Sequence, residues 1–258
     1  MLLNSVIIVL REFLEAALMI SVLLALGDGV PTGRRWAGWS ICIGLAGGVV
    51  YAGNIAMVSD WLDGVGQEVV NALMQIMIYC CLTLTVVLFS NRRARTGGRM
   101  VFLMMTSVSL AIMREGSEIL IYLSSFTNNP ELFEPILLGG MVGAGIGVSV
   151  GVLAYYGLLS ANRNGSSYAS IGAAILIAAG IAGQATLLLI QADWLPSRAP
   201  LWDSSGWISE HSVTGQLLYA LIGYEATPSS IQAAVYLASL ILPVILIVLV
   251  KKSSNLDE

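Results

Sequence analysis

Two copies of the pattern Arg-Glu-x-x-Glu each lie within a long apolar stretch of the sequence. Their charged residues are Arg11, Glu12 and Glu15 in the first copy and Arg114, Glu115 and Glu118 in the second. On a helix, the two acids of each copy are three residues apart and so share one face. A carboxylate at bilayer depth costs from a few to more than about ten kcal/mol, so such groups are kept where a membrane protein uses them. The paired motifs therefore indicate a path for cations through a membrane.

The charge balance of the motifs indicates what kind of ligand they could hold. Each Arg precedes the second Glu of its motif by four residues, close enough to pair with it on a helix. Four carboxylates against two guanidiniums leave a formal excess of two negative charges, which is unfavourable in a low dielectric. A bound cation would remove this excess, and carboxylate oxygens prefer hard metal ions. A purely structural ion pair would need only one acid per Arg, so a switchable cation site is the better interpretation.

The composition is that of a membrane protein with several spans. Hydrophobic residues make up 57% and charged residues 11% of the 258 residues, far from the range of soluble domains. A membrane-spanning helix needs about 20 apolar residues. The apolar stretches predict seven such helices, at roughly 2–26, 36–58, 68–90, 100–126, 136–160, 168–191 and 229–250. We therefore predict an all-α polytopic membrane protein with seven transmembrane helices.

We expect residues 1–258 to form a single transmembrane domain built from two three-helix repeats. Each motif opens a series of three spans whose second span is rich in glycine, over residues 1–90 and again over 100–191. Three spans per unit give the two units opposite orientation, and inverted repeats of this kind hold their substrate site near the bilayer midplane. The seventh helix, 229–250, has no counterpart. The segment 192–228 is rich in Trp, which predicts an outer loop or interfacial element.

Basic residues indicate the orientation of the chain in the membrane. Most of the 12 Lys and Arg residues fall in loops that share one side with the C-terminal tail. By the positive-inside rule that side is cytoplasmic, so we expect a multi-pass protein of the cell (inner) membrane with its N-terminus outside and its C-terminus in the cytoplasm. The opposite loops are acidic, and acidic loops attract cations. Four of their residues are candidates for an outer entrance: Asp60, Asp63, Glu68 and Asp203.

At the two motifs the sequence resembles the high-affinity iron permease family, the oxidase-dependent iron transporters of fungi and their bacterial relatives. The hallmark of that family is Arg-Glu-Gly-Leu-Glu in the first and fourth spans, from which this chain departs at Phe13 and Ser117, neither of them a ligand position. The resemblance extends over nearly the whole chain. The part that resembles the bacterial C-terminal signature consists of Pro200-Leu201-Trp202-Asp203-Ser204-Ser205, Gly223-Tyr224, Pro228, Gln232 and Tyr236.

The resemblance implies seven helices and iron moved inward, as ferric ion, with no permanent cofactor. The metal ligands that it implies are Glu12, Glu15, Glu115 and Glu118, and we take Arg11 and Arg114 as the charge-balancing residues. It also implies a partner on the outer face, a periplasmic or extracellular iron-delivering protein or a ferroxidase. Besides iron and membrane lipid we expect no nucleic-acid partner, and the sequence leaves a homo-oligomer open.

Two other functions stay open on the sequence alone. One is transport of a different hard cation such as manganese or lead, because carboxylates select weakly among such ions. The other is an intramembrane metal-dependent enzyme, which needs His or further acids in its spans to hold a metal and activate water. The one histidine of the chain, His211, lies outside the predicted spans. We therefore predict a transporter without catalytic residues rather than an enzyme.

Overall fold

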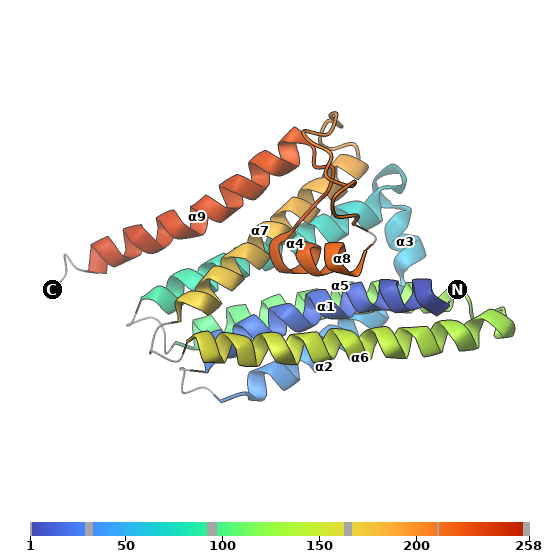
Figure 1. Ribbon diagram of the computed structural model, residues 1–258, viewed down its shortest axis with the longest axis horizontal. Coiled ribbons are helices and arrows are strands. Elements are labelled where there is room, and N and C mark those ends of the chain that lie inside the picture. The colour runs from blue at the N-terminus through green and yellow to red at the C-terminus, as the bar shows by residue number, and fades with distance from the viewer. Residues whose placement is uncertain (1, 29–32, 92–96, 163–166, 211, 255–258) are drawn as a thin grey trace.

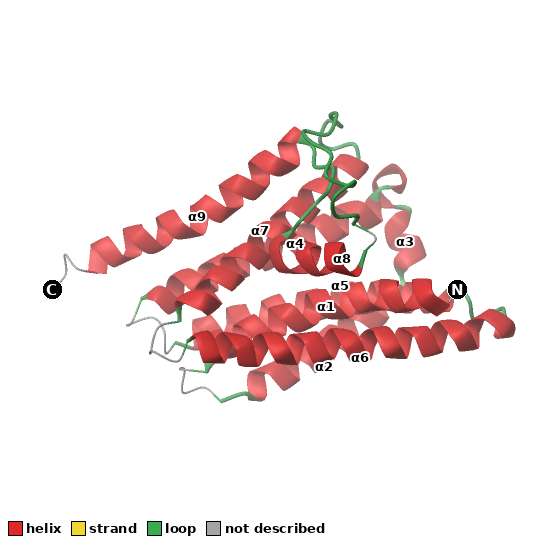
Figure 2. Cartoon of the chain, in the orientation of Figure 1, coloured by secondary structure: helices red, strands yellow, loops and turns green. Residues whose placement is uncertain are grey.

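The computed structural model describes residues 2–28, 33–91, 97–162, 167–210 and 212–254. Within these ranges the regular elements are helices joined by loops (Figure 2). The helices are α1 (Leu2–Gly27), α2 (Arg35–Gly53), α3 (Ile55–Ser59), α4 (Gly66–Ser90), α5 (Gly98–Ser124), α6 (Pro130–Ala161), α7 (Tyr168–Gln191), α8 (Val213–Ile222) and α9 (Ser230–Ser254). A 3₁₀ turn, Trp61–Gly64, separates α3 from α4, and one isolated bridge pairs Pro200 with Ser229.

Five of the described helices are long and apolar enough to cross a membrane: α2, α4, α6, α7 and α9. The two helices that carry the motifs, α1 and α5, have 26 and 27 residues. At 1.5 Å per residue each is about 40 Å long, which also suffices to span a bilayer. What sets them apart from the other five is that each carries the three charged residues of a motif. The expected all-α, multi-pass protein is confirmed, whereas the count of seven spans stays a prediction.

The second predicted span, 36–58, is interrupted rather than continuous. α2 ends at Gly53, and α3 begins at Ile55 after a break at Asn54. Gly and Asn both have low helix propensity. The Asn54 side-chain amide also donates a hydrogen bond to the carbonyl oxygen of Val50 at 2.8 Å, at the end of α2. The prediction of one unbroken helix is therefore wrong at this end.

Each motif helix packs against the Gly-rich helix of the other half of the chain. α1, which carries the first motif, packs along the Gly-rich α6, and α5, which carries the second, packs along the Gly-rich α2 (Figure 1). These helices approach closely: a Cβ added to Gly147 would lie 2.8 Å from the Cβ of Phe13, and one added to Gly44 would lie 2.7 Å from that of Ile112. Small residues allow such close packing inside lipid. Two equivalent halves would pair in this reciprocal way, although the inverted repeats and their boundaries stay predictions.

An apolar core fills the space between α1, α4, α5 and α7. Its buried side chains include Leu14, Leu18, Ile78, Leu82, Met104, Val108 and Ile177. α8 lies against α1 and α7, and α9 contacts α7 and α4 while most of its surface remains exposed. The packing of α1 against α5, within this core, determines where the motif side chains can meet.

Candidate metal centre

The two motifs meet where α1 faces α5. One carboxylate oxygen from each of Glu12, Glu115 and Glu118 lies within 4.8 Å of the other two. Glu12 and Glu115 are 6% and 5% exposed, whereas Glu118 is partly exposed. Both halves of the chain therefore contribute to a group of three hard oxygen donors, of which one reaches a more open space. We call this group the three-glutamate centre.

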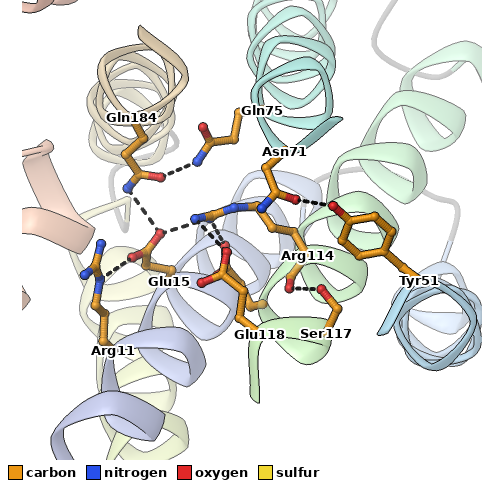
Figure 3. Close-up of polar contacts among 10 residues, drawn as sticks. Arg11, Glu15, Tyr51, Asn71, Gln75, Arg114, Ser117, Glu118 and Gln184 are labelled. Carbon is orange, nitrogen blue, oxygen red and sulfur yellow. Dashed lines mark hydrogen bonds and ion pairs between the residues drawn. The ribbon is translucent and has the colours of Figure 1, made fainter. Parts of the chain in front are cut away.

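Glu15, the fourth predicted ligand, is not a member of this group. Its Oε1 lies 3.3 Å from Nε of Arg11, and its Oε2 lies 3.7 Å from Nη1 of Arg114. The side-chain amide of Gln184 donates to the same Oε2 at 3.1 Å (Figure 3). Because both of its oxygens are engaged, Glu15 balances the charge of the two Arg residues in this conformation.

Arg114 contacts three of the four motif carboxylates (Figure 3). Besides Glu15 it pairs with Glu118 at 3.2 Å and with Glu115, the residue next to it in the chain. Arg114 is buried, and its backbone carbonyl accepts a hydrogen bond from Oγ of Ser117 at 2.6 Å. A buried guanidinium offsets repulsion among carboxylates when it contacts several of them. This geometry favours the charge-balancing role predicted for Arg114.

Arg11 lies at the periphery of the same cluster. Its side chain is 39% exposed, and its guanidinium carbon lies 4.3 Å from the centre of the Tyr219 ring. Such a cation–π contact is favourable, and more so where water is excluded. Because Tyr219 belongs to α8, the contact ties this short helix to α1 beside Glu15.

A pocket of about 330 Å³, which we call the vestibule, leads to the centre. It is lined by Gln67, Glu68, Asn71, Glu118, Ile121, Tyr122, Leu188 and Gln191. One of the four acids predicted for an entrance, Glu68, thus shares this pocket with Glu118 of the centre. The other three, Asp60, Asp63 and Asp203, are exposed elsewhere on the described surface and do not line the vestibule.

Asp203 makes local contacts in the loop before α8. Its Oδ1 accepts hydrogen bonds from the backbone N–H of Ser205 at 2.9 Å and from the hydroxyl of Ser205 at 2.6 Å. These bonds stabilise the ionised carboxylate and hold the pKa of Asp203 below its usual range. The contacts are those of a turn, and a part for Asp203 in an entrance stays a prediction.

A second cavity, of only about 20 Å³, lies beside the centre, and we call it the inner chamber. Its polar wall consists of Glu15, Gln75, Arg114, Glu115, Gln184 and Tyr219. Its apolar wall includes Met19, Ile78 and Ile177, all three of which belong to the apolar core. The chamber has room for about one water-sized ligand. Apolar packing therefore closes the bundle beyond it.

Several polar side chains around the centre are not among the residues singled out from the sequence. Gln75 of α4 donates to Gln184 of α7 at 2.7 Å, and Tyr51 of α2 donates to Asn71 of α4 at 3.0 Å (Figure 3). Asn71 and Gln75 are four residues apart, so they lie on one face of α4. Polar residues at helical spacing within an apolar span are a signal that could have identified them.

The chemistry of the centre is that of hard oxygen donors. Among the described residues, the group that could hold a metal ion consists of carboxylates only, and His211 lies outside the described residues. Such a donor set suits hard cations, and it differs from the donor sets of zinc hydrolases, which contain His. The four motif carboxylates and two guanidiniums carry a formal excess of two negative charges when ionised, which favours capture of a cation in a low dielectric.

Comparisons with known proteins place the chain among membrane transporters. The ferrous iron permeases EfeU of Escherichia coli O6:H1 strain CFT073 and of Shigella sonnei strain Ss046 are each 26% identical over 267 residues, covering 91% of both chains. That of Shigella flexneri is 30% identical over 136 residues, which are 52% of this chain and 57% of the relative. No solved structure matches the chain. Residues 2–252 match the iron permease FTR1 family, and because this match covers nearly the whole chain, the protein belongs to that family.

Proposed function

We propose that this chain moves ferrous iron across the membrane through the three-glutamate centre. The observation that carries the proposal is that Glu12, Glu115 and Glu118 bring one oxygen each within 4.8 Å of the others, from two different helices. Carboxylates that face one another in a low dielectric repel strongly unless a cation or a proton lies between them. The arrangement is therefore suited to binding a hard cation within the bundle, as a permease for iron requires.

The charge of the site favours a divalent ion. Two formal negative charges remain after the motif Arg residues are counted, and a single Fe²⁺ ion neutralises them. The relatives are named ferrous iron permeases. The resemblance of the sequence implied a ferric ion, whose third charge would leave the site with a positive excess. We therefore assign ferrous iron as the substrate and treat ferric iron as the competitor to be tested.

An ion would enter through the vestibule, where Glu68 adds a carboxylate, and would reach Glu118 first. From there Glu12 and Glu115 would hold it in the buried part of the centre. The membrane potential favours inward movement of a cation by about 2.3 kcal/mol per charge at 100 mV, hence about 4.6 kcal/mol for a divalent ion. An iron-delivering protein on the outer face is the expected partner, whereas a ferroxidase would fit a ferric substrate only.

The test is uptake of Fe²⁺ into lipid vesicles that contain the purified protein and an entrapped fluorescent chelator. Glu115→Gln and Glu118→Gln keep the side-chain size but remove the charge, so each should lower uptake by about ten-fold or more. The matched control is Glu131→Gln, which changes an exposed acid in the first turn of α6 and should leave uptake unchanged. Wild-type uptake in both centre variants would overturn the proposal.

Competition in the same vesicles tests the identity of the ion. Mn²⁺ and Pb²⁺ are each offered alone and then against Fe²⁺ with the reductant held constant, whereas Fe³⁺ is offered alone without reductant, because a reductant would convert it to Fe²⁺. We expect Fe²⁺ to be taken up fastest. Faster uptake of Fe³⁺ would reject the ferrous assignment while leaving the glutamate centre in place, and transport of Mn²⁺ or Pb²⁺ without iron would support the alternative hard cation.

A further inference from the structure

Gln75 and Gln184 join the two helices that follow the Gly-rich spans. Gln75 of α4 is 1% exposed, and its Nε2 donates to Oε1 of Gln184 of α7 at 2.7 Å (Figure 3). Both residues line the inner chamber together with Glu15 and Glu115. Amide groups this deep in an apolar bundle cost free energy unless their polar atoms find partners.

Glu15 determines which way the two amides point. Nε2 of Gln184 donates to Oε2 of Glu15, so the Oε1 of Gln184 is the atom that accepts from Gln75. This leaves Oε1 of Gln75 without a partner among the described residues, and Oε2 of Glu115 is unpaired in the same way. An unpaired buried acceptor destabilises the folded protein, a cost that a purely structural amide pair has no reason to carry. Two such residues on the wall of one chamber supply oxygens that a cation could bind.

The inner chamber lies in line with the vestibule along the same helices. On α4, Asn71 of the vestibule is followed one turn later by Gln75 of the chamber. On α5, Glu118 of the vestibule lies three residues from Glu115 of the chamber, and α7 lines both spaces as well. Residues three or four apart on a helix are neighbours at about 5–6 Å. A cation that leaves Glu118 along this face therefore meets Glu115 and then Gln75.

We propose that Gln75 and Gln184 form an amide station that receives the transported cation from the three-glutamate centre. The inference rests on the proposed function. Carboxamide oxygens are hard but neutral ligands, so they hold a divalent ion less tightly than carboxylates and let it move on. In this conformation the hydrogen bond between the two amides joins α4 to α7 and blocks the route of the cation beyond the inner chamber. Parting the amides frees Oε1 of Gln184 as a second ligand beside Oε1 of Gln75.

Two measurements with Fe²⁺ as the probe test the amide station: equilibrium binding to the purified protein and the maximum rate of uptake into vesicles. Gln75→Leu and Gln184→Leu replace each amide by an apolar side chain of similar size. We expect Kd to stay within about three-fold of the wild-type value while the maximum uptake rate falls by about ten-fold or more. Gln75→Glu retains an oxygen ligand, so it should tighten binding and support faster uptake than Gln75→Leu.

The matched control is Thr83→Val, which removes another buried, unpaired oxygen from α4 without reaching the chamber. It should leave both binding and uptake unchanged. Uptake within about two-fold of wild type in both Leu variants would overturn the amide station. Equal losses of binding and uptake would overturn it too, because the amides would then belong to the three-glutamate centre itself.

Two further measurements distinguish loss of the amide station from unfolding of the variants and from failure of the proposed function. Thermal unfolding in detergent shows whether the Leu variants are folded. If they are not, Gln75→Glu decides, and wild-type binding together with wild-type uptake in that variant rejects the station. The proposed function fails independently, when Glu115→Gln and Glu118→Gln still bind Fe²⁺ as the wild type does.

Discussion

Arg114 of the second motif lies 3.7 Å from Glu15 of the first, so the cation of one half of the chain neutralises an acid of the other. The same guanidinium contacts Glu115 and Glu118 of its own motif. α1 and α5 are thereby joined through buried charge at the position where we propose that iron binds. Any rearrangement that separates the two helices has to break this ion pair or replace it with the charge of the substrate.

Replacing Arg114 should destabilise the protein strongly. Arg114→Ala leaves three carboxylates without their buried cation, and breaking a buried pair in this way costs about 3–5 kcal/mol. The thermal unfolding midpoint in detergent measures the loss. Arg34→Ala is the control, because it removes exposed contacts, the pair with Asp28 (2.9 Å) and the hydrogen bond to Tyr155 (2.6 Å), and should lower the midpoint far less than Arg114→Ala. Equal midpoints for the two variants would show that the Arg114 pairs contribute no net stability.

Two neighbouring glycines of α6 should respond in opposite ways to the same change. A Cβ at Gly147 would lie 2.8 Å from the Cβ of Phe13 in α1, whereas one at Gly145 meets open space. Gly147→Ala should therefore push α1 away and lower stability by about 1–3 kcal/mol. Gly145→Ala should leave stability unchanged or raise it slightly, since Ala favours helix over Gly. A fall in the unfolding midpoint that is the same for both would rule out the close approach of α1 and α6.

The ring of Tyr219, rather than its hydroxyl, should hold Arg11 in place. Tyr219→Phe keeps the aromatic face 4.3 Å from the guanidinium, but Tyr219→Leu removes it and with it about 0.5–2 kcal/mol of cation–π attraction. We expect the Phe variant to match the wild type in unfolding midpoint and Fe²⁺ uptake, and the Leu variant to be lower in both. If Phe and Leu variants behave alike, the contact between α8 and α1 does not depend on the ring.

Glu225, in the loop between α8 and α9, should make stability depend on pH. Burial raises its pKa above the ordinary value of 4.5, and the hydrogen bond from Gln232 opposes this in part. Because the folded protein then holds the proton more tightly than the unfolded chain, Glu225 contributes most to the free energy of unfolding at pH values below its ordinary pKa. It is lost as pH rises through the folded pKa.

Glu225→Gln removes this titration while it keeps a hydrogen-bond acceptor for Gln232. The free energy of unfolding of the variant should therefore fall less than that of the wild type as pH rises from about 4 toward neutrality. Unfolding by denaturant at a series of pH values measures the difference, with Glu131→Gln as a control for an exposed acid. Parallel pH profiles for wild type and Glu225→Gln would contradict the raised pKa.

Much of the architecture could be predicted because membrane helices have a strong local signal. Apolar length located the helices, and a charged motif within two of them located the centre. The break at Asn54 was missed because a single weak helix former does not interrupt an apolar run by itself. α6 begins at Pro130, earlier than the predicted 136, since Pro is well suited to the first turn of a helix.

The details of the centre depend on packing that the sequence does not show. Helical spacing predicts that the two acids of each motif share a face, but the gathering of Glu12 with the second motif depends on how α1 lies against α5. The distinct position of Glu15 depends on Arg114 and Gln184, which come from other helices. No spacing rule within one helix could assign these contacts.

The packing of each motif helix against a helix of the other half has a consequence for biogenesis. α1 is made before α6, yet it packs along α6, which follows only after α2 to α5. Glu12 and Glu15 likewise meet Glu115 and Arg114 only after α5 is made, so at about 5–20 residues per second these motif charges lack their partners from the second half for several seconds of translation. We expect the cellular yield of this protein to depend on how quickly its second half is synthesised.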